Sequence, residues 1–329
     1  MGEKLRIAIF GAGGICERAY LPILTTWPDI EIIGLYSRTD ASVKKICRKF
    51  HLVNGTTNAQ QLIDMKPDAA FVLTNDQTHF RFTEMLLKAG KDVFVEKPLA
   101  QNSKEVKFLA ELAREKKKIL MVGFNRRFAP LYKKAKELFR DKKIQMAIIQ
   151  KHRPRATHVN LYNNYLDDTI HQIDLLRFFG GDAVPISTFS ERGNEKLIGA
   201  VSVCGLKDGG IGVVMTSLKA GSWQESATLH GENTTIEVEA FEKLVIKTDG
   251  NMQVLGTDRS GKWISDLHER GFYGEIEHFF HCVDSREQPE TNGDDTLQTH
   301  LLLEEMAAIG GEEPGKPLAD GWDNIPRWE

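Results

Sequence analysis

The sequence predicts a two-part α/β protein: an N-terminal Rossmann domain with a doubly wound parallel sheet, then an α+β domain with a mostly antiparallel, open-faced sheet. Three observations support this prediction. Strand and helix patterns alternate through the first third of the 329 residues, a glycine turn follows the first strand, and later strand patterns succeed one another without helices between them. The length favours two domains, which we expect at residues 1–124 and 125–329.

Alternating patterns define the first part of the chain. Short apolar runs, each typical of a strand buried on both faces of a sheet, occupy residues 5–10, 30–36, 69–73, 92–95 and 119–122. Helical patterns separate them at residues 41–50, 80–89 and 103–116. Because strand–helix–strand crossovers are right-handed almost without exception, this alternation predicts a doubly wound parallel sheet.

The second part of the chain loses this alternation. Helical patterns cover residues 132–139, 168–179 and 274–283, and we expect the last of them to pack on the second domain. Strand patterns cover residues 145–150, 199–205, 210–217, 226–230, 235–239 and 243–247. Strands that follow one another through turns predict an antiparallel sheet with helices on one face.

Composition argues against several classes of function. The formal net charge of −3 gives no reason to expect nucleic acid as a partner. No apolar run approaches the roughly 20 residues of a membrane span, and the N-terminus lacks the features of a signal peptide. The four cysteines are scattered, as expected in a reducing cytosol. We expect a cytoplasmic protein without a metal site, although Glu275, His278 and His281 have helix-face spacing.

A glycine turn follows the first strand directly. The segment GAGGIC at residues 11–16 joins that strand to a helix, and its glycines allow a tight turn and close approach of a pyrophosphate. The helix N-terminus adds amide donors. Cys16 stands where the dinucleotide fingerprint has glycine or alanine, so the match is imperfect. The position between strand and helix still predicts a dinucleotide site made by Gly11, Gly13, Gly14 and Ile15.

The end of the second strand bears on the choice between NAD and NADP. NAD enzymes usually place Asp or Glu there to hold the ribose 2′-hydroxyl. Here Ser37 and Arg38 follow Tyr36, and a hydroxyl with a guanidinium suits a 2′-phosphate. We expect NADP to be favoured over NAD. The alternative is that Arg38 is a solvated loop charge.

Candidate acid–base residues lie in both parts of the chain. Lys97, in the tripeptide EKP, follows a strand at the sheet edge where open α/β sheets bind ligands, and the proline restricts its backbone. Asp167 and His171 lie four residues apart on one helix face, so that His171 could exchange a proton with a substrate hydroxyl. Taken alone, the tripeptide is typical of a surface turn and the carboxylate of an N-cap.

A basic cluster precedes the helix of Asp167 and His171. It comprises Lys151-His152-Arg153-Pro154-Arg155, with His158 shortly after. If this cluster faces the cleft, it implies an anionic substrate such as a sugar acid or sugar phosphate. A solvated strand end and contacts to a partner subunit are equally good interpretations.

These motifs together resemble the glucose–fructose oxidoreductase/inositol dehydrogenase/MocA (Gfo/Idh/MocA) family. TNDQTH at residues 74–79 is similar to the TPNxxH loop of that family, with Asn75 in place of proline, and GFNRRF at residues 123–128 fits its domain-boundary motif. The resemblance extends from Leu5 to about Leu303. MVGFNRRFAPLY, KHR and ERGF further resemble the MviM-like bacterial branch, which is named for a virulence locus.

The resemblance implies hydride transfer between a nicotinamide cofactor and a hydroxyl-bearing carbon of a sugar, polyol or related small substrate. Lys97 would polarise the reacting oxygen, His171 would move its proton, and Asp167 would bind or orient. The charge of Lys97 would favour a neutral imidazole at His171. Further cofactor contacts are expected from Thr74, Asn75, His79, Glu96, Lys97 and Arg126.

Two departures from the family pattern and two alternative functions stay open. Asp168 adds a second carboxylate, and Thr169 stands near the place of a usual glycine; both could alter the substrate pocket. The fold also suits a cofactor-binding regulator without turnover, although the retained acid–base residues argue against it. An enzyme that cleaves glycosides through transient oxidation is a further alternative. The resemblance also implies a homodimer or homotetramer.

Overall fold

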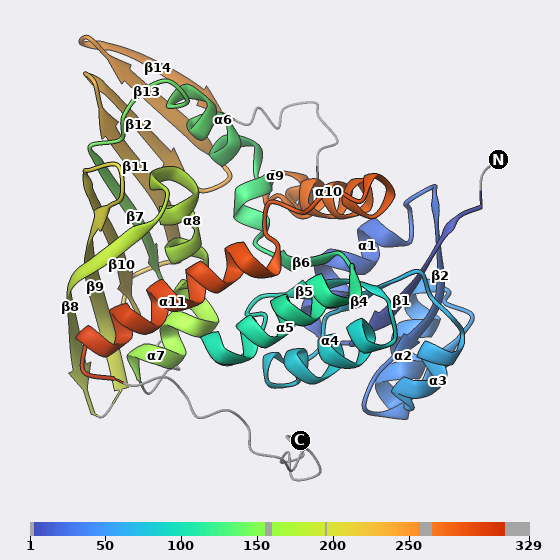
Figure 1. The fold of residues 1–329 in the computed structure, drawn as a ribbon. Coiled ribbons are helices and arrows are strands. Elements are labelled where there is room, and N and C mark those ends of the chain that lie inside the picture. The colour runs from blue at the N-terminus through green and yellow to red at the C-terminus, as the bar shows by residue number, and fades with distance from the viewer. Residues whose placement is uncertain (1–2, 155–159, 195, 257–264, 313–329) are drawn as a thin grey trace.

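Two sheets dominate the protein, a six-stranded one near the N-terminus and an eight-stranded one after it (Figure 1). A computed structural model describes residues 3–154, 160–194, 196–256 and 265–312. Within these ranges no helix combines the length and the apolar character that crossing a membrane requires.

The six-stranded sheet is parallel throughout, with the strand order β3-β2-β1-β4-β5-β6. Its strands are β1 (Leu5–Phe10), β2 (Ile30–Tyr36), β3 (Gly55–Thr56), β4 (Ala69–Val72), β5 (Asp92–Glu96) and β6 (Leu120–Gly123). This order, in which the chain moves outward from β1 in both directions, is that of a doubly wound dinucleotide-binding fold, and the predicted Rossmann sheet is confirmed.

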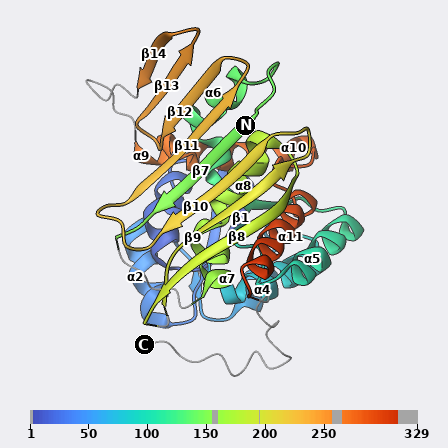
Figure 2. The same ribbon diagram turned by 90° about the vertical axis from the view of Figure 1, so that its left-hand side faces the viewer.

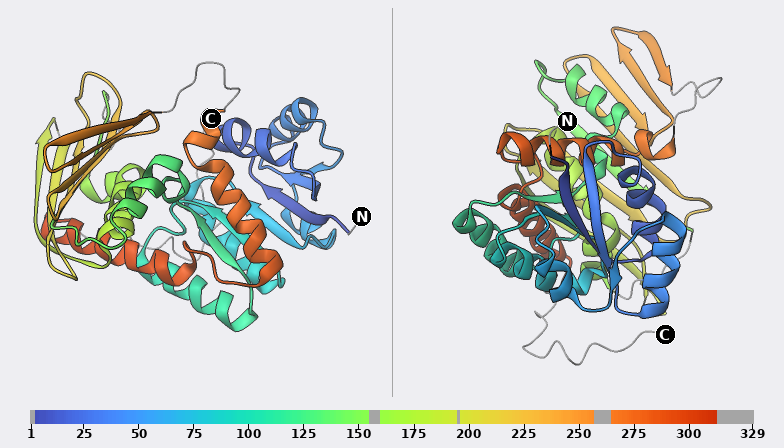
Figure 3. Two further views of the ribbon diagram at one scale, coloured as in Figure 1. Left: turned by 90° about the horizontal axis from the view of Figure 1, so that it is seen from above. Right: turned by 90° about the vertical axis from the view of Figure 1, so that its right-hand side faces the viewer.

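Helices cover both faces of this sheet (Figure 3). Successive strand residues point to opposite faces, so that Ile7 and Ile9 contact one layer of helices while Ala8 and Phe10 contact the other. The first layer contains η1 (Cys16–Tyr20), α1 (Leu21–Leu24), α2 (Asp40–Phe50) and α10 (Phe272–Ser285). The second contains α3 (Ala59–Asp64), α4 (His79–Lys88) and α5 (Ser103–Lys116).

Helix α10 corrects the expectation that residues 274–283 pack on the second domain. Phe279 of this helix packs edge-on against Phe71 and Phe94 of the parallel sheet, with ring centroids 5.3 and 5.6 Å apart. The physical reason is that this sheet is apolar on both faces, and on one side the N-terminal helices cover Phe71 and Phe94 only in part, through Tyr20. The division of the chain at residue 124 stays a prediction.

The eight-stranded sheet has the order β14-β13-β12-β11-β7-β10-β9-β8. Its strands are β7 (Met146–His152), β8 (Ala183–Gly193), β9 (Lys196–Leu206), β10 (Ile211–Ser217), β11 (Gln224–Gly231), β12 (Thr234–Glu239), β13 (Lys243–Thr248) and β14 (Asn251–Gly256). Of its pairs only β7–β10 is parallel, so the predicted mostly antiparallel sheet is confirmed. The two edge strands, β8 and β14, were not predicted.

The remaining helices lie between or beside the two sheets. They are η2 (Asp76–Thr78), η3 (Asn125–Phe128), α6 (Pro130–Leu138), α7 (Leu161–Asn164), η4 (Tyr165–Thr169), α8 (Ile170–Gly180), α9 (Asp266–Glu269) and α11 (Gly293–Ile309). Helices α6 and α8 cover the inner face of the large sheet. No helix of the described residues lies in front of its outer face, which gives the predicted open-faced sheet (Figure 2).

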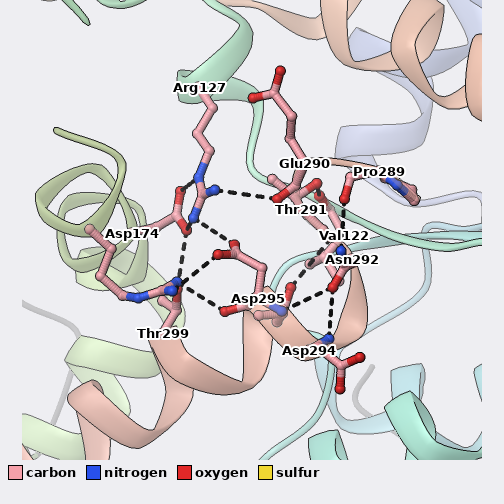
Figure 4. Close-up of polar contacts among 12 residues, drawn as sticks. Val122, Arg127, Asp174, Pro289, Glu290, Thr291, Asn292, Asp294, Asp295 and Thr299 are labelled. Carbon is pink, nitrogen blue, oxygen red and sulfur yellow. Dashed lines mark hydrogen bonds and ion pairs between the residues drawn. The ribbon is translucent and has the colours of Figure 1, made fainter. Parts of the chain in front are cut away.

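A buried ionic network holds α8 and α11 together at the junction of the two parts (Figure 4). Arg127 donates to Asp174 from Nε at 2.8 Å and from Nη2 at 2.5 Å. The same Nη2 lies 2.8 Å from Oδ2 of Asp295, whose Oδ1 accepts from Arg177 at 3.0 Å. This network fixes the start of α11 against α8 and against the turn that follows β6.

Candidate active site

The candidate site lies where several parallel strands end. Gly11 follows β1, Thr74 comes shortly after β4, and Lys97 follows β5, so all three lie at the carboxyl edge of the sheet. The loop carrying Asp167 reaches this edge from the second part, because the Lys97 ammonium donates to the backbone carbonyl of Asp167. A crevice at the carboxyl ends of the strands is the usual ligand site of such sheets.

The glycine turn has the shape that a bound pyrophosphate needs. Gly11 has a φ of 122°, and a side chain there would place its Cβ 2.3 Å from the Leu73 carbonyl oxygen, so only glycine fits. A Cβ on Gly13 would meet no atom within 4 Å, so the backbone there faces open space. Cys16 is fully buried, which shows that its thiol fits the close helix–strand contact. The residues present therefore fit a dinucleotide.

Arg18 is a residue of this turn that the sequence analysis did not single out. Its Nε donates to the Gly14 carbonyl oxygen at 3.1 Å, and the rest of the side chain is exposed beside the turn. The spacing of four residues along a helix could have identified it, because a cation one turn beyond the last glycine lies over the glycine backbone.

The end of β2 carries the residues predicted to choose between NAD and NADP. Arg38 is exposed, and Ser37 is half-buried and donates its backbone N–H to the Thr56 carbonyl. Burial raises the pKa of Tyr36, while the nearby Arg81 and Arg38 oppose that rise. A second arginine, Arg81 of α4, therefore lies close to this position.

The TNDQTH loop is held to the EKP turn by His79. The Nδ1 of His79 lies 2.7 Å from the Pro98 carbonyl oxygen, and its Nε2 lies 3.2 Å from that of Thr74. Burial lowers the pKa of His79, so the neutral ring donates through one nitrogen only, and the shorter distance favours Nδ1. Asn75 caps η2 by accepting from the Gln77 amide at 3.1 Å. In this structure His79 and Asn75 thus shape the loop beside the candidate cofactor site.

Lys97 and Asp167 are brought together as the sequence predicted. Besides its bond to the backbone of Asp167, Nζ of Lys97 lies 3.6 Å from Oδ1 of that carboxylate. The Lys97 side chain is only 18% exposed, whereas that of Asp167 is 60% exposed. The Asp167 carboxylate does not cap α8, whose N-cap is Thr169. The side chain is instead open to solvent at the sheet edge.

His171 is buried and reaches Lys97 only electrostatically. Its pKa lies well below the ordinary value, first because of burial, then because of the charges of Arg126 and Lys97. This direction agrees with the neutral imidazole expected for His171, with Lys97 as a lesser cause than burial and Arg126. Nη1 of Arg126 donates to Nε2 at 3.0 Å, so the ring proton lies on Nδ1, which has no partner among the described residues.

Arg126, predicted as a cofactor contact, is held instead against a buried carboxylate that the sequence did not reveal. Its Nε and Nη2 donate to the two oxygens of Glu225 at 2.9 and 3.0 Å. Although burial opposes it, Arg126 keeps the pKa of Glu225 below its usual range. Glu225 lies 99 residues further along the chain, and no motif surrounds it. The fork aims the remaining guanidinium nitrogen of Arg126 at His171.

Two members of the basic cluster, Lys151 and Arg153, gather around Asp168, whereas His152 contacts Gln150. Lys151, which is 2% exposed, lies 2.7 Å from Oδ1 of Asp168 and donates to its backbone carbonyl at 2.9 Å. Nε of Arg153 donates to Oδ2 at 2.7 Å. Despite burial, these cations hold the pKa of Asp168 well below its usual range. Arg155 and His158 lie outside the described residues.

This ion cluster explains the first departure from the family pattern. Asp168 points away from the open edge and is neutralised, so it adds no free carboxylate beside Asp167. Burial, followed by the charge of Arg126, lowers the pKa of Lys151 to about 8. The cluster holds the turn of π-helix, η4, that presents Asp167 on one side and leads into His171 on the other.

Glu96 belongs to a second buried group behind Lys97. The Tyr20 hydroxyl lies 2.8 Å from Oε1 of Glu96 and 2.9 Å from Oε1 of Glu275, and it has one proton to donate. Burial, and then the charge of Glu96, raises the pKa of Glu275 well above its usual range. A protonated Glu275 donating to Tyr20, which donates to Glu96, satisfies both contacts. The other oxygen of Glu96 accepts from the Lys97 amide at 2.9 Å.

Of the two histidines of α10, His278 serves a structural role, and His281 is exposed. Nε2 of His278 accepts from the Glu290 amide at 3.0 Å, and the Glu275 carboxyl is engaged with Tyr20. Across the described part of the chain, His, Cys, Asp and Glu side chains nowhere form a group of three or more that could hold a metal ion.

Comparisons with known proteins agree with this geometry. Residues 5–124 match a family described as an oxidoreductase family with an NAD-binding Rossmann fold. The protein YceM of Salmonella typhimurium is 30% identical over 318 residues, which cover 92% of this chain and 97% of YceM. The myo-inositol 2-dehydrogenase of Thermotoga maritima is 26% identical over 94% of this chain and 99% of its own length. The structure of the dehydrogenase MviM from Clostridium difficile matches with a TM-score of 0.85 at 27% identity, covering 92% of this chain and 98% of that one.

The fold and the site define a dinucleotide-binding oxidoreductase with two sheets. The chain belongs to the Gfo/Idh/MocA family of oxidoreductases, as its motifs predicted, and MviM is among the structures it resembles. It is therefore an NAD(P)-binding enzyme of a family whose named members include a dehydrogenase that acts on a CH–OH group.

Proposed function

We propose that this enzyme transfers a hydride between NAD(P) and a hydroxyl-bearing carbon of a sugar, polyol or related small substrate. The observation that carries the proposal is the meeting of Lys97 with Asp167 at the sheet edge beside the open glycine turn. An ion pair that serves only stability is expected to bury both partners or to expose both. Here Lys97 is largely buried, whereas the carboxylate of Asp167 is open to solvent. A neutral His171 within the field of Lys97 completes an acid–base set.

In this proposal the three residues divide the work. Lys97 polarises the reacting oxygen, and Asp167 binds a neighbouring hydroxyl. His171 accepts the hydroxyl proton at Nε2 as the alcohol becomes a carbonyl. Because Arg126 now donates to that nitrogen, the substrate hydroxyl has to displace the guanidinium first. A bound nicotinamide would supply the hydride acceptor, or the hydride in the reverse direction.

We propose NADP as the favoured cofactor. Gly11, Gly13, Gly14 and Ile15 would hold the pyrophosphate. Arg38 would bind the 2′-phosphate together with Ser37, and the nearby Arg81 adds positive charge. Thr74, Asn75, His79, Glu96 and Arg126 stay predicted contacts, of which His79 and Asn75 would act by shaping their loop.

Fluorescence titration with NADPH and NADH tests the cofactor proposal. We expect wild type to bind NADPH more tightly, and Arg38→Ala to weaken NADPH at least about tenfold while leaving NADH nearly unchanged, because only NADPH carries the 2′-phosphate. Arg48→Ala, an exposed arginine of α2, is the matched control. Equal loss of both cofactors in Arg38→Ala would contradict the 2′-phosphate contact, and no binding of either would overturn the function itself.

The alternative of a regulator without turnover is separated by His171→Gln. An enzyme should lose about 10²- to 10⁴-fold in kcat with this substitution, at nearly unchanged NADPH affinity, because the ring acts on the substrate proton. The assay is oxidation of a panel of polyols, sugars and sugar acids followed by NADPH absorbance. A wild type that binds cofactor yet oxidises none of them, and whose reverse reaction is also absent, would favour the regulator.

Two further proposals concern the setting of the enzyme. We propose a homo-oligomer, because apolar side chains on the outer face of the large sheet are exposed, among them Val184, Ile186 and Phe189 of β8. We also propose a cytoplasmic location, because all four cysteines are free thiols. An anionic group on the substrate is supported by Arg153, which is 43% exposed beside the site.

A further inference from the structure

A basic cavity lies on the far side of α8 from the candidate active site. It has a volume of about 880 Å³, is open to solvent, and is lined by α6, the C-terminal end of α8 and the turn between β9 and β10. Six cationic side chains line it, namely Arg127, Lys133, Lys136, Arg140, Lys142 and Lys143. Only three acidic residues join them, Glu137, Asp208 and Glu290. A chain with a net charge of −3 thus concentrates positive charge at one place.

Most of these cations lack a carboxylate partner. Within the described ranges only Arg127 forms ion pairs, with Asp174 and Asp295, and the five others form none. Nζ of Lys136 lies 4.0 Å above the Phe178 ring, and that of Lys142 donates to the Thr234 hydroxyl at 2.8 Å. Burial, followed by the charge of Arg127, lowers the pKa of Lys136, and the charges of Glu290, Asp295 and Asp174 oppose this shift.

Helix ends do not account for the excess of charge. Helices α6 and α8 both terminate at the cavity, and each C-terminus carries roughly half a negative charge. Two such ends offset about one of the cations. Glu137 is also engaged outside the cavity, where its carboxylate accepts from Lys134 at 3.1 Å. With Arg127 paired and Glu137 engaged elsewhere, five cations face Asp208, Glu290 and the two helix ends, so about two positive charges stay uncompensated. A small ligand with two or more negative charges would balance them.

The cavity is separate from the candidate active site. The two consecutive arginines of η3 diverge: Arg126 points toward Glu225 and His171, whereas Arg127 points toward Asp174 and lines the cavity. Phe178 and Phe179 of α8 form an apolar wall of the cavity that is largely buried, with the ammonium of Lys136 over the Phe178 ring. Cations around an apolar wall are suited to a phosphate-bearing compound with a nonpolar or stacking part.

We propose that this cavity binds a small polyanion carrying at least two phosphate groups. Lys133, Arg140 and Lys143 supply the charges that face it, and Lys136 closes it over Phe178. Inorganic pyrophosphate and the phosphate chain of a nucleotide share this chemistry. The proposal does not depend on the proposed hydride transfer.

Isothermal titration calorimetry with pyrophosphate, at low salt and at 0.15 M salt, tests the proposal. At 0.15 M salt the Debye length is about 8 Å, so charges further apart than this are largely screened. We expect binding that weakens with salt and that falls at least about tenfold in the double variant Lys133→Gln/Arg140→Gln. Both residues are exposed on or next to α6, so the fold is not expected to change. Lys134→Gln is the matched control, because Lys134 neighbours Lys133 on the same helix but does not line the cavity.

The candidate cofactor site could also bind pyrophosphate, and a second variant distinguishes it. Arg18→Gln/Arg38→Gln removes two cations beside the glycine turn and leaves the cavity unchanged. If this variant loses pyrophosphate and the Lys133/Arg140 variant keeps it, the cavity proposal is overturned, as it is if wild type binds none. Titration with ATP in place of pyrophosphate shows whether an adenosine group strengthens binding through the apolar wall, which would identify a nucleotide as the source of the phosphates.

Discussion

Single buried histidines make the stability of this protein depend on pH. His300 is fully buried, neither ring nitrogen has a partner among the described residues, and burial lowers its pKa to about 3. Burial also lowers the pKa values of His79 and His171. In the unfolded chain these rings take up a proton below about pH 6.5, whereas the folded chain keeps them neutral. The unfolded state therefore gains protons as the pH falls, and stability that is present above pH 6.5 is lost below it.

We expect His300→Leu to reduce this pH dependence. The wild-type ring contributes about 1.4 kcal/mol to the loss of unfolding free energy between neutral pH and pH 5.5. Urea titrations at pH 7.5 and 5.5 measure the loss in wild type and variant. His281→Leu, at a ring that is 61% exposed, is the control and should keep the wild-type slope. An unchanged slope in His300→Leu would mean that this ring is charged in the folded state.

Neutralising each of the two neighbouring carboxylates of η4, Asp167 and Asp168, should have very different effects on stability. Asp168→Asn leaves the buried Lys151 without its counter-charge, which should cost about 3 kcal/mol of unfolding free energy. Asp167→Asn removes an exposed carboxylate and should change stability by less than about 0.5 kcal/mol while lowering turnover. Chemical denaturation and the polyol assay measure the two effects. Equal stability of the two variants would show that the Lys151–Asp168 ion pair does not stabilise the fold.

The residues of the site could be predicted from sequence only where motifs carry them. Lys97 and Asp167 follow recognisable segments, and the structure brings them together. Glu225 stands in no motif; the pairing of β11 with β7 places it opposite Lys151, and it meets Arg126 of η3 from 99 residues away. Glu275 reaches Tyr20 from 255 residues away. Such partners depend on the register of packed elements, which local residue patterns do not specify.

At the scale of elements, the Arg127–Asp174–Asp295 network connects η3, α8 and α11. Asp174 is almost fully buried, and its loss would leave the Arg127 charge short of its main partner. We expect Asp174→Asn to cost about 3 kcal/mol of unfolding free energy. Asp294→Asn is the control, because Asp294 adjoins Asp295 but is 56% exposed and pairs with the exposed Arg114 at 3.5 Å. Guanidinium denaturation compares them, and a difference below about 1 kcal/mol would contradict the role of the network.

Helices and strands with one clear hydrophobic periodicity could be predicted from the sequence. Those that pack against several elements, or that lie at a sheet edge, could not. The buried strands of the Rossmann sheet read as apolar runs, and α5 was predicted over its observed span. Helix α11 packs against α5 on one side and β8 and α8 on others, so its apolar residues form no single face. Strand β8 contains Pro185 and exposes its apolar residues, and β14 is exposed nearly throughout. Both lie at sheet edges, where the alternation of buried and exposed residues weakens.

At the scale of the whole molecule, the open outer face of the large sheet should determine the oligomeric state. Phe189 is 68% exposed, and half-buried apolar side chains such as Val201 and Met215 continue the same face on the neighbouring strands. We expect Phe189→Glu to shift a dimer or tetramer toward the monomer, because the substitution places a charge in an apolar contact. Size-exclusion chromatography with light scattering measures the mass.

Val53→Glu is the control for this experiment, since Val53 is 91% exposed but lies on the Rossmann side of the molecule, away from the large sheet. The two variants carry the same change of charge and differ only in the surface they alter. A wild type that is monomeric at micromolar concentration would rule out the proposed oligomer, and an unaltered mass in Phe189→Glu would exclude this face as the interface.

The return of α10 to the parallel sheet has a consequence for how the chain folds during synthesis. Phe71 and Phe94 are synthesised long before Phe279 and Ile276, so the part of this sheet face that α10 covers stays exposed until that helix is made. The N-terminal part is then apolar on that side and prone to association until its cover arrives. A fragment ending at residue 124 should accordingly bind a hydrophobic dye and aggregate, and a separately added peptide of residues 265–290 should rescue its solubility.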